Sequence, residues 1–260
     1  MLVAVIVIAA GAVVYLNRPA GESEAVPLTT TTVSAWATET MIMQLPNPVQ
    51  KKPAMVSCAY RATPGLRQIA AQLPKTADIR ANTGGRVPYQ MNTGLGVIGL
   101  SLDTAASPCT VNSFISLATQ HYYDATKCHR MTTSPGLKVL QCGDPSGTGM
   151  GGPGYQFENE YPTDVFASPE KAATEQVLYP RGTLAMANAG PDPLTGAGTN
   201  GSQFFLVYGD STLPPTYTVF GTVDQAGLAV LDRVAAAGTV AGGEDGEPKL
   251  TVDIGSIAAK

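Results

Sequence analysis

Alternating apolar and small residues mark a series of short β-strands from about residue 91 onward. Residues 92–94, Asn-Thr-Gly, are typical of a hairpin turn, and Ile98, Leu100 and Leu102 then alternate with small residues, as in a half-buried strand. Similar short apolar segments predict further strands near residues 127–131, 139–142, 183–186, 203–208, 217–223 and 250–254.

Two segments follow the helical period instead. Ser107 is a predicted N-cap, Pro108 suits the first helical position, and the apolar residues of 111–118 fall on one face. A second helix is predicted over 226–237, with Gly238 as its stop. Many short strands, two helices and no repeated βαβ spacing predict a mainly β fold, a closed antiparallel barrel with helices over its ends.

The first 17 residues form an apolar N-terminal segment. Residues 2–16 carry no charge, and as a helix they would rise about 22 Å, less than the about 30 Å of a bilayer's hydrocarbon core. The run follows Met1 directly, without the basic residues that open a secretory signal. We expect an apolar helix that anchors the chain in the cell membrane, with the rest outside the cytoplasm. A cleaved signal, giving a secreted protein, and a start codon further upstream are the alternatives.

The remaining chain divides into three parts. Residues 18–54 contain a threonine run and recurrent prolines, which predict a flexible linker. Residues 55–90 show no clear period and are interpreted as an extension packed on the main domain. Residues 91–260 carry the strand and helix patterns and are expected to form that domain.

Composition and charge narrow the function classes. Charged residues make up only 14% of the chain, the net charge is −4, and the largest basic cluster is the pair Lys51-Lys52, which argues against a nucleic-acid partner. Four cysteines, Cys58, Cys109, Cys128 and Cys142, suggest two disulfides if the domain is exported and four free thiols if it is cytosolic. Their spacing permits three connectivities and offers no Cys-x-x-Cys zinc motif, so we expect no metal.

Two enzyme classes are disfavoured by local context. Residues 147–152 match the Gly-x-Gly-x-x-Gly pattern of dinucleotide sites, but prolines flank them where a strand and a helix are required, so we expect a surface loop and no cofactor. No Gly-x-Ser-x-Gly surrounds a serine, and His121 and His129 are the only histidines, so a hydrolase is also disfavoured.

Three stretches, at residues 128–160, 182–209 and 217–223, carry five motifs in a fixed order. These are His-Arg, Gln-x-Gly-Asp, Met-Ala-Asn-Ala-Gly-Pro, Asn-Gly-Ser-Gln-Phe-Phe and Val-Phe-Gly. Together they resemble the cyclophilin-type peptidyl-prolyl cis-trans isomerases over about residues 91–258, and the extended form is similar to membrane-anchored members from actinobacteria. The resemblance implies a closed eight-stranded cyclophilin-like barrel with two capping helices, and isomerase activity on X-Pro bonds during protein folding outside the cytoplasm.

The resemblance also implies a set of functional residues. Arg130 would be the catalytic cation, which favours the twisted prolyl amide, and Phe205 would form the floor of the proline pocket. The complete substrate-binding set is Val139, Leu140, Gln141, Ala187, Asn188, Gln203, Phe205, Leu213 and Tyr217. Phe204 is expected to face the core instead. In the family fold Cys109 and Cys128 lie on neighbouring elements, which implies the pairs Cys109–Cys128 and Cys58–Cys142.

The expected partners are proline-containing polypeptides and, through the N-terminal segment, the membrane; we expect a monomer. Val139 and Tyr217 stand where the best-known members have an aromatic residue and a histidine, so the pocket walls differ. The alternative function is a non-catalytic module of the cell envelope that binds proline-containing peptides. Retention of Arg130 favours the enzyme, and the loss of an aromatic wall favours the binding module.

Overall fold

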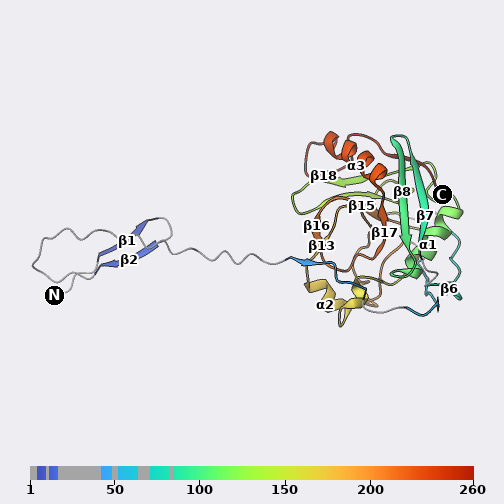
Figure 1. Ribbon diagram of the computed structural model, residues 1–260, viewed down its shortest axis with the longest axis horizontal. Coiled ribbons are helices and arrows are strands. Elements are labelled where there is room, and N and C mark those ends of the chain that lie inside the picture. The colour runs from blue at the N-terminus through green and yellow to red at the C-terminus, as the bar shows by residue number, and fades with distance from the viewer. Residues whose placement is uncertain (1–4, 10–11, 17–41, 49–51, 64–70, 82–84) are drawn as a thin grey trace, which may run out of the picture. The chain divides into compact units, whose positions relative to one another are not determined.

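The computed structural model describes residues 5–9, 12–16, 42–48, 52–63, 71–81 and 85–260. The chain divides into two compact units, Met1–Thr40 and Met41–Lys260. In the first unit, β1 (Val5–Ala9) and β2 (Ala12–Leu16) pair as an antiparallel hairpin, drawn in blue in Figure 1. The predicted apolar helix is therefore wrong for both segments. They are rich in valine and isoleucine, whose branched Cβ atoms favour strands over helices.

The second unit contains a large antiparallel sheet. Its ten described strands follow the order β18 (Asp245–Gly246), β10 (Arg130–Thr132), β11 (Lys138–Cys142), β15 (Phe204–Gly209), β14 (Thr183–Met186), β17 (Val219–Val223), β8 (Gly96–Asp103), β7 (Arg86–Thr93), β19 (Asp253–Ala259) and β9 (Thr126–Lys127). Only residues 128–129 separate β9, at one end of the sheet, from β10, near the other. The sheet must therefore curl until its ends approach. Among the described residues no strand pairing joins the two ends, so the structure shows a curled ten-stranded order and does not show the predicted closed eight-stranded barrel.

Two long helices lie where the sequence predicts them (Figure 1). α1 (Pro108–Thr119) has proline at its N-terminus, and α3 (Gln225–Ala237) begins at Asp224, whose side chain accepts a hydrogen bond from the Gly227 N–H. α3 ends at Gly238, which has a φ of 74°, a value that glycine adopts without strain. A short helix, α2 (Pro169–Thr174), and a 3₁₀ turn, Thr163–Val165, were not predicted.

The N-terminus of α1 is satisfied by a residue distant in sequence. Ser107, the predicted cap, donates its hydroxyl to the Val219 carbonyl instead. The carboxylate of Glu160 accepts from the backbone N–H groups of Cys109 and Thr110, at 3.2 and 2.8 Å. A carboxylate at this position also complements the positive end of the helix dipole.

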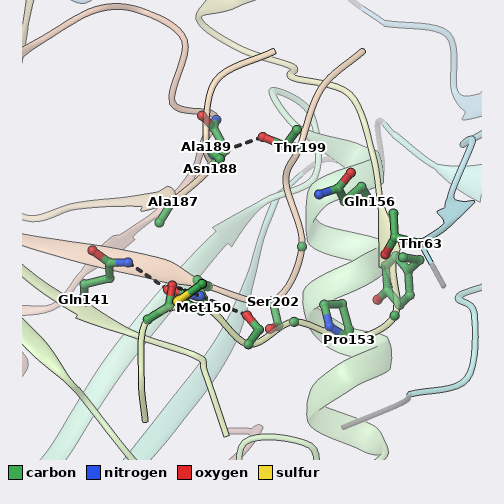
Figure 2. A pocket seen from close by; sticks show the side chains of 17 residues that line it. Thr63, Gln141, Met150, Pro153, Gln156, Ala187, Asn188, Ala189, Thr199 and Ser202 are labelled. Atoms are coloured by element: carbon green, nitrogen blue, oxygen red, sulfur yellow. Dashed lines mark hydrogen bonds between the residues drawn. The ribbon is translucent and has the colours of Figure 1, made fainter. Parts of the chain in front are cut away.

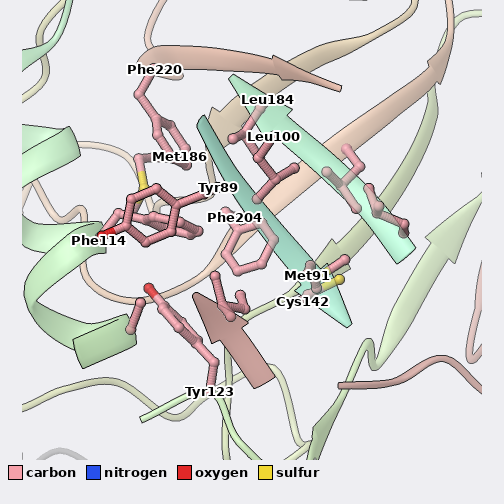
Figure 3. Close-up of a cluster of buried hydrophobic side chains, with 14 of the residues drawn as sticks. Tyr89, Met91, Leu100, Phe114, Tyr123, Cys142, Leu184, Met186, Phe204 and Phe220 are labelled. Atoms are coloured by element: carbon pink, nitrogen blue, oxygen red, sulfur yellow. The ribbon is translucent and has the colours of Figure 1, made fainter. Parts of the chain in front are cut away.

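The main core lies between the inner face of the curled sheet and the helices. Phe114 of α1 packs against Phe204 and Phe220, with ring centroids 5.5 and 5.2 Å apart, and Tyr123 closes the cluster (Figure 3). All four side chains are almost fully buried, and each such burial contributes roughly 1.5–3 kcal/mol. Phe204 thus faces inward, as predicted.

A second, smaller core covers the outer face of the same sheet. Buried Val139, Val177, Tyr179, Ala185, Phe205 and Val207 form it. A three-stranded sheet frames it, with β16 (Ser211–Leu213), β13 (Val177–Tyr179) and β3 (Met43–Gln44) in that order. Because alternate residues of a strand face opposite sides, β11 and β15 contribute to both cores.

Residues before β7 are integrated into this unit. β3 pairs in parallel with β13, and the Tyr161 hydroxyl donates to the Pro46 carbonyl at 2.7 Å, so the predicted flexible linker over 18–54 is wrong for residues 42–48. Residues 18–41 lie outside the described residues. β4 (Met55–Val56) pairs with β6 (Ile79–Arg80), and β5 (Arg61–Ala62) pairs with β12 (Tyr155–Gln156). The predicted boundary at 90/91 falls inside β7.

The disulfides differ from the expected pairing. Cys58 bonds Cys109 and Cys128 bonds Cys142, with Cα separations of 5.4 and 4.0 Å. Regular alternation along one strand from residue 128 to Arg130 would put Cys128 and Cys142 on opposite faces of the sheet. The strand is interrupted there. The Cys128 N–H donates to the backbone carbonyl of Val252, whereas the His129 N–H donates to the backbone carbonyl of Gln141. This break turns Cys128 toward Cys142.

Among the described residues, none of the helices is both long and apolar enough to cross a bilayer.

Candidate functional site

Three directly paired residues form a row across β10, β11 and β15. Arg130 lies opposite Gln141, and Gln141 lies opposite Phe205. Residues directly opposite one another in an antiparallel pair face the same side of the sheet. The register therefore places a cation, an amide and an aromatic ring side by side on the outer face.

Arg130 is held by two neighbours. Its Nε and Nη2 atoms donate to the two carboxylate oxygens of Asp245, at 2.8 and 2.7 Å, and Nη1 donates to Gln141 Oε1 at 3.0 Å. The hydrogen bonds that Arg130 donates to Asp245 raise the pKa of Arg130, and Tyr217 adds to this effect. The same hydrogen bonds lower the pKa of Asp245. Both groups are therefore charged at neutral pH.

A chain of amides continues from Arg130 to a glycine-rich loop. Gln141 Nε2 donates to Gln203 Oε1 at 2.8 Å, and Gln203 Nε2 donates to the carbonyls of Gly149 and Gly151, both at 2.9 Å. The predicted residues Arg130, Gln141 and Gln203 thus form one hydrogen-bonded array.

The predicted apolar residues lie on the other side of Gln141. Phe205 is 5% exposed and its ring packs edge-on against Tyr217, with centroids 5.8 Å apart. Leu213 and Tyr217 are half-buried and pack on the second core, with Val139 beneath them. Because Phe205 lies opposite Gln141, which lies opposite Arg130, this apolar cluster continues the row that contains the cation.

Leu140 does not belong to this face. It is fully buried in the main core, opposite Met131 and Leu206. Alternation along β11 explains the correction, since Val139 and Gln141 face the outer side and the residue between them must face inward.

Two cavities flank Gln141. The first, of about 380 Å³, is lined by Gln141, Ala187, Asn188, Gln203 and the loop 149–154; Figure 2 shows Gln141, Ala187 and Asn188 around it. The second, of about 390 Å³, is bordered by His129, Arg130, Gln141, Gly147–Gly149 and residues 245–247. Neither is lined by Phe205, Leu213 or Tyr217. The apolar cluster is therefore a separate part of the site.

Asn188 is largely engaged within the protein. Its Nδ2 atom donates to the Thr216 carbonyl at 2.9 Å and to Asn200 Oδ1 at 3.1 Å, and its Oδ1 accepts from the Gly190 N–H. The adjacent Ala187 N–H donates to the Gln203 carbonyl. Asn188 therefore links its own loop to the loops of Asn200 and Thr216 at the edge of the first cavity.

The glycine-rich loop is organised by a buried carboxylate. Asp144 accepts from the Ser146 and Gly151 N–H groups at 2.7 and 3.0 Å, from the Thr148 N–H at 3.1 Å, and from the Ser146 hydroxyl. Glycine is required at 151, since a Cβ there would lie 2.0 Å from Asp144 Oδ1. Burial alone would raise the pKa of Asp144, but these hydrogen bonds outweigh it and lower the pKa.

Replacing Asp144 by asparagine should destabilise the protein by about 2 kcal/mol or more, because a buried charged acceptor becomes a neutral amide among donors. The carboxylate has a lowered pKa in the folded state, so its contribution is full above its ordinary range and is lost as the pH falls through the lowered value. Denaturant unfolding from pH 7 to pH 2 measures both effects. The difference between wild type and variant should shrink at acid pH; a difference that stays constant would contradict this assignment.

His129 borders the second cavity without a charge. Burial lowers its pKa below the ordinary value of 6.5, and although Asp144 raises it, the nearby Arg130 adds to the lowering. The positive charges near this cavity are therefore those of Arg130 and of Lys127, which pairs with Glu247. Within the part of the chain that the structure describes, no group of three or more His, Cys, Asp or Glu residues is placed to hold a metal ion.

Sequence reasoning missed Asp245, and the reason is topological. It lies on β18, in an acidic turn of residues 244–247 about 115 residues after Arg130, and no local period marks it. Acidic residues in a glycine-rich turn are usually solvated. Only the pairing of β18 with β10 brings it to the guanidinium.

Comparisons with known proteins identify the family of the chain. Residues 88–259 match the family described as cyclophilin type peptidyl-prolyl cis-trans isomerase/CLD. The chain is 53% identical over 201 residues to a probable peptidyl-prolyl cis-trans isomerase B of Mycobacterium tuberculosis, covering 77% of this chain and 63% of that protein. Its Mycobacterium leprae counterpart is 52% identical, with 73% of this chain and 66% of that protein covered. The chain thus spans somewhat less than two thirds of these relatives' length.

A solved structure supports the same fold. The crystal structure of a cyclophilin type peptidyl-prolyl cis-trans isomerase from Cryptosporidium parvum is 27% identical, with a TM-score of 0.51, and the match covers 67% of this chain and 98% of that one. The family match extends from β7 to β19 and includes every residue of the outer-face row. The chain belongs to the cyclophilin-type peptidyl-prolyl cis-trans isomerase family.

Proposed function

We propose that this protein is a peptidyl-prolyl cis-trans isomerase that accelerates X-Pro isomerisation during protein folding. One observation carries the proposal: Arg130, fixed by Asp245 and Gln141, lies in a row with the apolar surface of Phe205. The membership of the chain in the isomerase family supports it.

The chemistry requires no nucleophile, base or metal. Resonance of the C–N bond gives an X-Pro amide a rotation barrier of roughly 18–20 kcal/mol. A site lowers this barrier if it binds the twisted amide more tightly than either planar form. Twisting localises the lone pair on the prolyl nitrogen, so a hydrogen-bond donor aimed at that nitrogen stabilises the transition state.

The residues of the site provide an apolar surface for the proline ring, a donor for the prolyl nitrogen and polar groups for the flanking peptide. The apolar cluster of Val139, Phe205, Leu213 and Tyr217 holds the proline ring. Arg130 donates an N–H to the prolyl nitrogen, because its guanidinium remains charged and its donors form a rigid fork. Gln141 and Gln203, and the backbone around Ala187 and Asn188, hold the flanking peptide. One side of the bound amide then swivels while the other stays fixed.

The proposed cellular role follows from the rate of the uncatalysed reaction. X-Pro isomerisation takes tens to hundreds of seconds, which is slow enough to limit folding. We propose that the domain acts outside the cytoplasm, because two disulfides are typical of oxidising compartments. Fractionation of the native host, with the four thiols labelled before and after reduction, tests the location. Recovery in the membrane fraction would support attachment through residues 1–17.

A proline-peptide isomerisation assay on the full chain tests the activity. We expect acceleration that scales with enzyme concentration and depends on Arg130. Saturable binding of a proline-containing peptide without acceleration would instead support the non-catalytic binding module. Absence of both binding and acceleration would contradict both functions.

A further inference from the structure

The guanidinium of Arg130 is gripped on one edge by a carboxylate. Asp245 receives Nε and Nη2 in a bidentate pair, and Gln141 receives Nη1. Three of the five N–H donors of an arginine are thereby engaged. The remaining donors point away from the Asp245 edge, and the guanidinium plane has a single orientation.

The loop that carries Asp245 is itself fixed. Thr239 and Pro248 form a β-bridge, the Val240 N–H donates to the Glu247 carbonyl, and the Lys249 N–H donates to the Gly238 carbonyl, both at 2.9 Å. On its other side the loop pairs with β10, with Asp245 opposite Thr132. Arg130 is the diagonal neighbour on the same face, within reach of a long side chain. The backbone that carries Asp245 is therefore held by β10 on one side and by the hydrogen bonds of its own loop on the other.

Resting on the isomerase function proposed above, we propose that Asp245 is a positioning residue: its carboxylate orients Arg130 so that the free N–H groups face the bound prolyl amide. The carboxylate also neutralises part of the positive charge, and the two effects oppose each other. Orientation prevails, because the pair is exposed (41% for Arg130 and 55% for Asp245) and water screens the charge effect. Without this partner, the arginine side chain would populate many rotamers.

The chain offers a matched control. Arg181 and Asp232 form a second bidentate pair, at 2.8 and 2.9 Å, with similar exposures of 33% and 56%. Asp232 lies on α3, outside the residues that line the site. Replacing Asp232 by alanine removes a two-hydrogen-bond arginine–carboxylate pair, here through Nη1 and Nη2, without touching Arg130.

The experiment measures kcat and KM for Asp245→Ala, Asp245→Asn and Asp232→Ala. Asp245→Ala should lower kcat about fivefold, equivalent to about 1 kcal/mol of transition-state stabilisation, with KM nearly unchanged. Asp245→Asn should recover most of this loss, because its Oδ1 still accepts from the guanidinium. Asp232→Ala should behave as wild type. An Asp245→Ala variant with wild-type kcat, in an active enzyme, would overturn the proposal.

Two further measurements separate this proposal from a purely structural role and from the proposed function. In an Arg130→Ala background, Asp245→Ala should cause no additional loss of kcat, whereas an additive loss would refute action through Arg130.

The second measurement is the NMR signal of the Arg130 Nε–H group, which is identified by its absence from Arg130→Lys. This signal should be sharp in wild type and in Asp232→Ala but lost in Asp245→Ala. This readout does not need activity. An inactive wild type with this pattern would refute the isomerase function alone, and an unchanged signal in Asp245→Ala would refute the positioning.

Discussion

Replacing Arg130 by alanine should lower kcat/KM for proline-peptide isomerisation at least tenfold and leave the fold intact. A tenfold loss corresponds to about 1.4 kcal/mol of transition-state stabilisation, which a preorganised charged donor in a partly desolvated site should exceed. Stability should change little, because the Arg130 side chain is 41% exposed and exposed ion pairs contribute about 0–1 kcal/mol. The isomerisation assay and thermal unfolding of the same preparations provide the two measurements.

Two further variants make this result specific. Arg181→Ala removes another paired, partly exposed arginine and should retain wild-type activity. Arg130→Lys keeps the charge but not the planar fork, so it should recover only part of the loss. Near-wild-type turnover of Arg130→Ala, with normal unfolding, would refute the proposed mechanism.

The elements with complete local signals could be predicted from sequence. α3 has an acidic cap at Asp224, an apolar face and Gly238 at its end, and α1 has Pro108 in its first turn. The β7–β8 hairpin has a turn and clean alternation. These signals act over a few residues, so they are readable without the fold. The row of Arg130, Gln141 and Phe205 was also accessible, but only through the order of family motifs.

The features that the sequence did not predict depend on contacts between distant segments. Glu160 rather than Ser107 satisfies the start of α1, Asp245 reaches Arg130 across β18 and β10, and residues 42–48 add a strand to β13. None of these has a periodic signature. Leu140 was assigned to the groove only because neighbouring motif positions were all assigned there together. Alternation itself turns both Phe204 and Leu140 inward, as the structure has them, because their strands are continuous at these residues. It failed at Cys128, where the strand is broken.

Removing the Cys58–Cys109 disulfide should be the most destabilising of the changes considered. The bond closes a separation of 51 residues, against 14 for Cys128–Cys142, and the loop-entropy model gives about 4 kcal/mol for the first and about 3 kcal/mol for the second. The first bond also ties the segment before β7 to α1, where the Tyr60 hydroxyl donates to the Cys109 carbonyl. In denaturant unfolding, the midpoint should therefore fall further for a Cys58→Ala/Cys109→Ala variant than for a Cys128→Ala/Cys142→Ala variant.

The two disulfide variants should rank in the opposite order when their activities are compared. α1 packs on the inner face of the sheet, whereas the Cys128–Cys142 bond lies two residues before Arg130 on one side and directly after Gln141 on the other. At 25 °C, folded Cys58→Ala/Cys109→Ala protein should keep kcat/KM within about twofold, and Cys128→Ala/Cys142→Ala should lose more, since small displacements of positioned groups reduce catalysis strongly. Peptide mapping of non-reduced wild type comes first, because a Cys109–Cys128 or Cys58–Cys142 link would reverse the connectivity on which both expectations stand. With the pairing established, equal stability losses in the two variants would show that loop length does not govern stability here, and equal activity losses would show that the Cys128–Cys142 bond does not brace the site.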